Sequence, residues 1–96
     1  MKVNFAKIMV KDIEGKTYPR DFSKEIGNTI FSTTKDIGEL DLARDIYHKG
    51  EVDLTKEQAQ MIRAHVEQNF LAWAKEAILP SLDAVINYKE QVKSKK

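Results

Sequence analysis

The stretch Gly50–Gln58, with the sequence GEVDLTKEQ, decides the fold because it ends one helix and begins the next. Gly50 follows an apolar pattern with helical spacing, and glycine adopts a left-handed backbone at a helix C-terminus at the least cost. Thr55 is placed to accept the backbone N–H of Gln58, whose side chain can reach back to the Thr55 amide. This capping box predicts that a helix begins at about residue 56.

Downstream of this junction, apolar side chains recur with helical spacing over more than five turns, which predicts the longest element of the chain. Pro80 lacks a backbone N–H and disfavours helical geometry at Leu79, so we expect the helix to kink or restart there. Two helices, or one bent helix, are predicted to cover residues 56 to about 90. The apolar stripe consists of Ala59, Ile62, Val66, Phe70, Trp73, Ala77 and Ile78, and resumes with Leu82, Val85 and Ile86.

Upstream of the junction, two shorter helices are predicted. Asp21 can cap a helix over residues 21–32, in which Phe22, Ile26 and Ile30 recur at four-residue spacing. Asp36, with Glu39 three residues later, resembles a capping box and predicts a helix over residues 37–49.

The N-terminal residues 2–18 favour a β-hairpin with its turn at Glu14-Gly15-Lys16, ended by Pro19. The apolar positions change face along the first strand, so a bulge is expected near Ala6 or Lys7. The predicted fold is therefore α+β and mostly α, with an N-terminal β-hairpin followed by a three- to four-helix bundle.

Length and composition limit the possible classes. A chain of 96 residues with 42% apolar content suits one domain, predicted over residues 1–88, with a flexible basic tail at 89–96. There is no cysteine, which fits a reducing cytoplasm. No run approaches the ~18 apolar residues that cross a bilayer, so no membrane association is expected.

No catalytic or metal site is predicted. His48 and His65 do not have the spacing of zinc ligands on one helix face, and the four glycines are too dispersed for a phosphate-binding loop. An overlay of residues 45–56 on a calcium-binding loop places Tyr47, Lys49 and Lys56 where oxygen ligands are needed. We therefore expect no enzyme activity, no cofactor and no small-molecule substrate.

The broad apolar stripe from Phe70 to Ile86 exceeds what a small core is expected to bury, and exposed apolar surface commonly marks a protein interface. We expect an interaction surface for a protein partner or a second copy; its predicted residues are Phe70, Trp73, Ile78, Leu82 and Val85. The alternative is that a tight helical core absorbs the whole stripe.

A second hypothesis uses the lysine-rich C-terminus. Lys89, Lys93, Lys95 and Lys96 could contact phosphates, which would make the protein a small nucleic-acid-associated regulator. The net charge of only +1 argues against a dedicated nucleic-acid binder.

Several segments in this order resemble small proteins encoded in phage and prophage genomes. They are Val3-Asn4-Phe5, the turn Asp12–Lys16, then Leu42–Tyr47 and Gly50–Glu57, and the resemblance covers most of residues 3–82. Members of this group carry no known catalytic residues. The resemblance implies a mobile-element product in the host cytoplasm, acting as an accessory or chaperone-like protein in particle or tail assembly.

Overall fold

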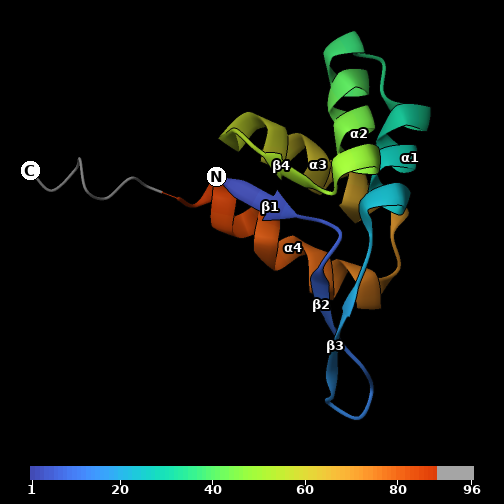
Figure 1. The fold of residues 1–96 in the computed structure, drawn as a ribbon, viewed down its shortest axis with the longest axis vertical. Coiled ribbons are helices and arrows are strands. Elements are labelled where there is room, and N and C mark those ends of the chain that lie inside the picture. The colour runs from blue at the N-terminus through green and yellow to red at the C-terminus, as the bar shows by residue number, and fades with distance from the viewer. Residues whose placement is uncertain (89–96) are drawn as a thin grey trace, which may run out of the picture.

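The computed structural model describes residues 1–88, and Figure 1 shows their arrangement. The fold is α+β and mostly helical, as predicted. In chain order its elements are β1 (Lys2–Asn4), β2 (Ile8–Lys11), β3 (Thr17–Arg20), α1 (Ser23–Thr33), α2 (Ile37–Lys49), β4 (Glu51–Asp53), α3 (Lys56–Asn69) and α4 (Ala72–Ile86).

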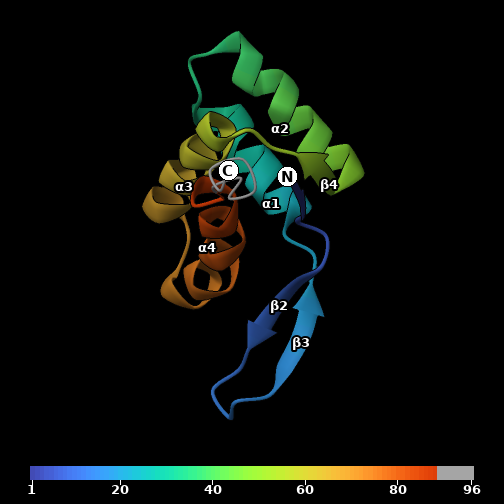
Figure 2. The same ribbon diagram turned by 90° about the vertical axis from the view of Figure 1, so that its left-hand side faces the viewer.

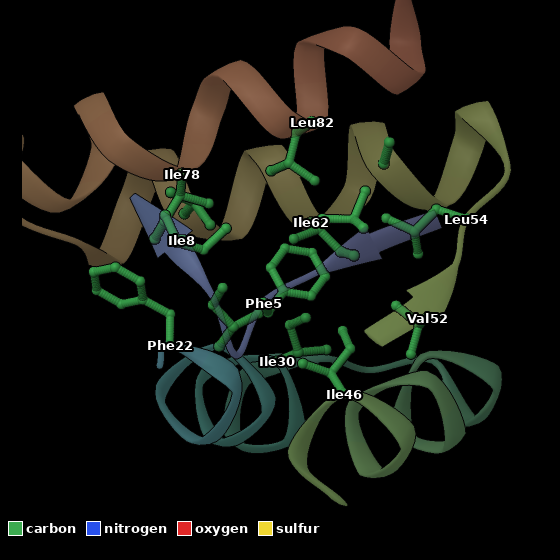
Figure 3. Packing of buried hydrophobic residues seen from close by; sticks show 14 of the residues in the cluster. Phe5, Ile8, Phe22, Ile30, Ile46, Val52, Leu54, Ile62, Ile78 and Leu82 are labelled. Atoms are coloured by element: carbon green, nitrogen blue, oxygen red, sulfur yellow. The ribbon is translucent and has the colours of Figure 1, made fainter. Parts of the chain in front are cut away.

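The four helices pack as two pairs, α1 with α2 and α3 with α4, and the core lies between the pairs (Figure 3). Gly27 allows the close approach within the first pair, because a Cβ atom there would lie 2.9 Å from the Ala43 carbonyl oxygen. Phe5, in the turn after β1, is fully buried between the two helix pairs. No helix within residues 1–88 combines the length and the apolar character needed to cross a membrane.

The N-terminal residues form two strands in two different sheets, where the sequence predicted one irregular strand. β1 pairs antiparallel with β4, with Val3 opposite Val52. A turn replaces the expected bulge, because the Ala6 N–H donates to the Asn4 side chain (3.0 Å) and the Lys7 N–H donates to the Asn4 carbonyl (3.3 Å). The chain thereby changes direction and enters β2.

The predicted hairpin is confirmed as β2 and β3, and it projects beyond the helices (Figure 2). The prediction that Pro19 ends the hairpin was wrong, because Pro19 lies within β3 opposite Met9. The Asp12 N–H donates to the Lys16 carbonyl (2.8 Å), so the alternating ladder leaves position 19 with its nitrogen on the outer edge. Proline is tolerated there because that edge position needs no donor.

The helix junction at Gly50 agrees with its prediction. Gly50 has a φ of +77°, and its N–H donates to the Ile46 carbonyl at the end of α2. The Thr55 hydroxyl accepts the Gln58 N–H (3.1 Å), while the Gln58 side chain accepts the Thr55 N–H (2.9 Å). Both halves of the predicted capping box are therefore present.

The other two helix starts differ in detail. α1 begins at Ser23, and the Asp21 carboxylate accepts the Ser23 N–H (2.8 Å) from just outside the helix. α2 begins at Ile37 as predicted, but Asp36 accepts weakly from Gly38 (3.4 Å). The Glu39 carboxylate accepts a hydrogen bond from the Thr34 hydroxyl, so the expected reciprocal capping box is absent there.

The long C-terminal helix is interrupted earlier than predicted. α3 ends at Asn69, whose side chain donates to the His65 carbonyl (2.9 Å), and Phe70 and Leu71 are extended. Pro80 lies inside α4 and does not end it. The break at residues 70 and 71 lets α4 fold back along α3, which returns its apolar side chains to the same core.

Candidate protein interface at the α3–α4 elbow

The extended residues between α3 and α4 turn a set of apolar side chains toward solvent. Leu71 is 70% exposed and Trp73 is 44% exposed, whereas Phe70 is partly buried against the core. Arg20, at the end of β3, borders this surface, and the buried ring of Phe22, just before α1, lies beneath it. We call these five residues, Arg20, Phe22, Phe70, Leu71 and Trp73, the elbow patch.

Aromatic packing holds the elbow patch in one arrangement. The buried ring of Phe22 contacts the Phe70 ring edge-on, with 6.4 Å between centroids, and the Trp73 ring at 6.0 Å. Such tilted and edge-on pairs each stabilise by about 0.5 to 1.5 kcal/mol beyond their buried area. The Trp73 ring is therefore braced from the core while a large part of it faces solvent.

Arg20 supplies the charged component of the patch. Its guanidinium carbon lies 5.0 Å from the Phe22 ring centroid and 5.2 Å from the Trp73 ring centroid, at cation–π distance. One terminal nitrogen of Arg20 donates to the Glu25 carboxylate (3.1 Å). The guanidinium is thus fixed over both rings and offers a planar cation at the rim of the surface.

Asp21 follows Arg20 in the chain, and its carboxylate stabilises the start of α1. The Ser23 side chain and backbone both donate to Asp21, and these hydrogen bonds lower the pKa of its carboxyl group. The ionised form is favoured because the donors stabilise negative charge.

A hollow of about 260 Å³ opens beside the patch. Its apolar wall is formed by Phe70, Leu71 and Trp73, and its polar rim by Glu25 and Asn69, among others. A hollow of this size accommodates an apolar side chain of a partner better than it encloses a whole small molecule, for which pockets usually exceed about 300 Å³.

The structure divides the predicted interaction surface. Phe70 and Trp73 lie together in the elbow patch, but Ile78 and Leu82 are fully buried and Val85 is 5% exposed. Figure 3 shows Ile78 and Leu82 pointing from α4 into the space between the helix pairs. These three predictions of surface residues were wrong, because the early helix break turns this face of α4 inward.

Sequence reasoning missed Arg20 and Phe22 as members of the patch. Their position beside Trp73 depends on the packing of the segment between β3 and α1 against the start of α4. Neither residue carries a local sequence signal for that contact, although Phe22 was predicted to lie on the apolar side of the first helix.

The remaining candidate residues do not join this surface. His48 is exposed in the last turn of α2, and His65 interacts with the Thr33 hydroxyl (3.1 Å) and lies 3.7 Å from the Glu39 carboxylate. Within residues 1–88, no three His, Asp or Glu side chains gather as a metal ion would require. Lys89, Lys93, Lys95 and Lys96 lie outside the described residues.

Comparison of the chain with protein-family models, with curated proteins and with solved structures gave no match.

Proposed function

We propose that this chain is a non-catalytic protein-interaction module that binds a protein partner, or a second copy of itself, through the elbow patch. The observation that carries the proposal is the joint exposure of Leu71 and Trp73 beside a hollow with an apolar wall. Large apolar side chains exposed next to each other commonly mark protein interfaces.

The patch has the composition of an interface centre. Tryptophan and arginine are enriched among the residues that dominate binding energy, and here Arg20 lies over the Trp73 ring. Because Phe22 and Phe70 brace that ring, binding would order few side chains anew, which lowers the entropic cost of association. A partner would place an apolar side chain in the hollow and cover Leu71.

The biological setting of the proposal rests on the resemblance to phage and prophage proteins. It is the assembly of a particle or tail in the host cytoplasm, where a small accessory or chaperone-like protein would cover an apolar surface of a structural protein. This role needs no catalytic group, only a rigid surface of the kind formed at the elbow.

Site-specific photo-crosslinking in the native host tests the proposal. Leu71 would be replaced by p-benzoylphenylalanine, and the matched control would carry the same residue at Ala64, which is exposed on α3. We expect a discrete covalent product at position 71, to a second copy or to another protein, and a much weaker one at position 64. Equal yields at both positions would reject the elbow patch as the interface.

A further inference from the structure

A second surface lies at the corner between β1 and β2, on the side where α4 crosses (Figure 1). A hollow of about 490 Å³ opens there between the N-terminal strands and the outer side of α4. The wall formed by β1, β2 and the turn between them includes Lys2, Lys7 and Met9, and the helix wall includes Glu76 and Ala84. We call this hollow the strand groove.

β1 leaves backbone groups unpaired on one edge. The Leu54 N–H donates to the Met1 carbonyl (2.9 Å) and the Phe5 N–H donates to the Gly50 carbonyl (2.8 Å), so alternate residues of β1 point toward β4. In an antiparallel ladder the intervening residues point the other way. The N–H and carbonyl groups of Lys2 therefore lie on the free edge.

β2 also has a free edge. The ladder with β3 continues from the Asp12–Lys16 hydrogen bond through the Val10–Tyr18 and Ile8–Arg20 pairs, so the backbone groups of Met9 point outward. Pro19 removes the donor from the outer edge of β3, but the outer edge of β2 contains no proline. Unpaired strand edges are templates for the addition of another strand.

The helix wall of the groove contains a proline and small side chains. Pro80 has no N–H to donate to the Glu76 carbonyl one turn earlier, and both residues line the groove. Ala77 and Ala84 on the same wall are small, which leaves room for side chains of a bound segment.

The charges at the groove favour an acidic ligand. Within residues 1–88, the ammonium group of Lys7 forms no salt bridge, whereas Lys2 lies opposite Asp53 in the β1–β4 pair and the terminal ammonium of Met1 is paired with Asp53 (2.7 Å). Glu76 is the single carboxylate residue of the lining. A strand added to β1 would place alternate side chains beside Lys2, and acidic residues there would complement its charge.

We propose that the strand groove binds an extended acidic segment of a partner protein by strand addition to the free edge of β1. The segment alternates acidic side chains, which face the lysines, with aliphatic side chains, which contact the small residues of α4. Backbone hydrogen bonds supply the affinity and the alternate side chains supply the specificity, as in other strand-addition complexes. This site is separate from the elbow patch.

Fluorescence anisotropy with labelled octapeptides tests this proposal on the full chain. The probe alternates valine and glutamate, and its two controls are the same peptide with lysine in place of glutamate and the same peptide with alternate backbone nitrogens methylated. We expect saturable binding of the acidic probe and at least about tenfold weaker binding of both controls. Amide resonances of Lys2 and Met9 should shift during a titration followed by NMR.

Matched variants locate the binding. Ala84→Arg fills the groove, whereas Ala64→Arg makes the same change at an exposed position of α3. We expect A84R to weaken binding by about tenfold or more and A64R to leave it unchanged. The double variant with Lys2→Glu and Lys7→Glu should prefer the lysine probe.

Two outcomes would overturn the proposal. One is the absence of saturable binding by the acidic probe, or binding of the lysine probe with equal affinity, and the other is equal affinity in A84R and A64R. Trp73→Ala separates the two proposals. It alters the elbow patch and should leave peptide binding at the strand groove unchanged.

Discussion

Gly50 lies at the contact between the end of α2 and the turn after β1. Its φ is +77°, and a Cβ atom there would approach the Ala6 Cβ to 2.8 Å. Gly15, in the hairpin turn, has a φ of +89° but has no neighbouring atom within 4 Å of that position. A side chain at position 15 would therefore add backbone strain alone, whereas a side chain at position 50 would add backbone strain and a steric conflict with Ala6.

Gly50→Ala should lower the free energy of unfolding by about 2 to 3 kcal/mol, because it combines backbone strain with the displacement of Ala6. Gly15→Ala should lower it by only about 1 kcal/mol, because strain alone acts there. Urea unfolding of both variants measures the difference. Equal losses would contradict the close packing of Gly50 against Ala6.

The stability of the folded protein should depend on pH through the ionisation of Asp21. Its pKa in the folded state is lowered by hydrogen bonds from Ser23, so its contribution is present above the unfolded-state pKa and is lost as the pH falls through the folded-state pKa. Asp21→Asn should be less stable than the wild type near about pH 7. The gap should narrow in acid, below about pH 3.

Unfolding curves of both chains at the two pH values measure this change. A gap that stays constant with pH would show that the ionised carboxylate of Asp21 contributes nothing to stability.

At the scale of the elements, Pro19 should prevent the outer edge of β3 from pairing with a strand of another molecule. Pro19→Thr restores an N–H on the outer edge of β3 and should allow edge-to-edge pairing between molecules. We expect concentration-dependent association of this variant in sedimentation experiments. Glu14→Thr, in the turn of the same hairpin, is the control; association of both variants to the same degree would rule out the edge as its cause.

Pro80 gives a second test at this scale. Because α4 continues through Pro80, an alanine there should restore a helical hydrogen bond to the Glu76 carbonyl and stabilise the chain, by up to about 3 kcal/mol. Thermal unfolding followed by circular dichroism measures the gain. A loss of stability in P80A would mean that the proline shapes the packing of α4.

The elements that could be predicted from the sequence carry local signals. The capping hydrogen bonds of Gly50 N–H, Thr55 and Gln58 span one helix turn, so the junction was visible in the sequence. The pairing of β1 with β4 joins short strands from distant parts of the chain, and no local pattern encodes it. The helix break at Phe70 and Leu71 has apolar residues with helical spacing and neither glycine nor proline, so Pro80 was the more visible candidate.

At the scale of the whole molecule, the candidate site could be predicted only in part. Phe70 and Trp73 belong to the apolar stripe, and its amphipathic spacing identified them. Which members of the stripe are buried depends on how α4 folds back on α3, and this placed Ile78, Leu82 and Val85 in the core. Arg20 and Phe22 join the site through tertiary packing alone.

Because part of the apolar stripe is buried and part is exposed, truncating a side chain in each part should lower the free energy of unfolding by different amounts. Leu82→Ala removes a fully buried side chain and should cost about 2 to 5 kcal/mol of unfolding free energy. Trp73→Ala removes a half-exposed side chain and should cost about 1 to 2 kcal/mol. Chemical unfolding of both variants checks the order; a larger loss for W73A would place Trp73 in the core and remove it from the interface.

The photo-crosslink at position 71 in chains with and without Trp73→Ala tests the central claim most directly. The claim is that the elbow patch is the protein-binding surface. We predict that W73A, folded as judged by circular dichroism, loses most of the crosslinked product, because the braced indole ring forms the wall of the hollow. An undiminished yield in folded W73A would contradict the claim.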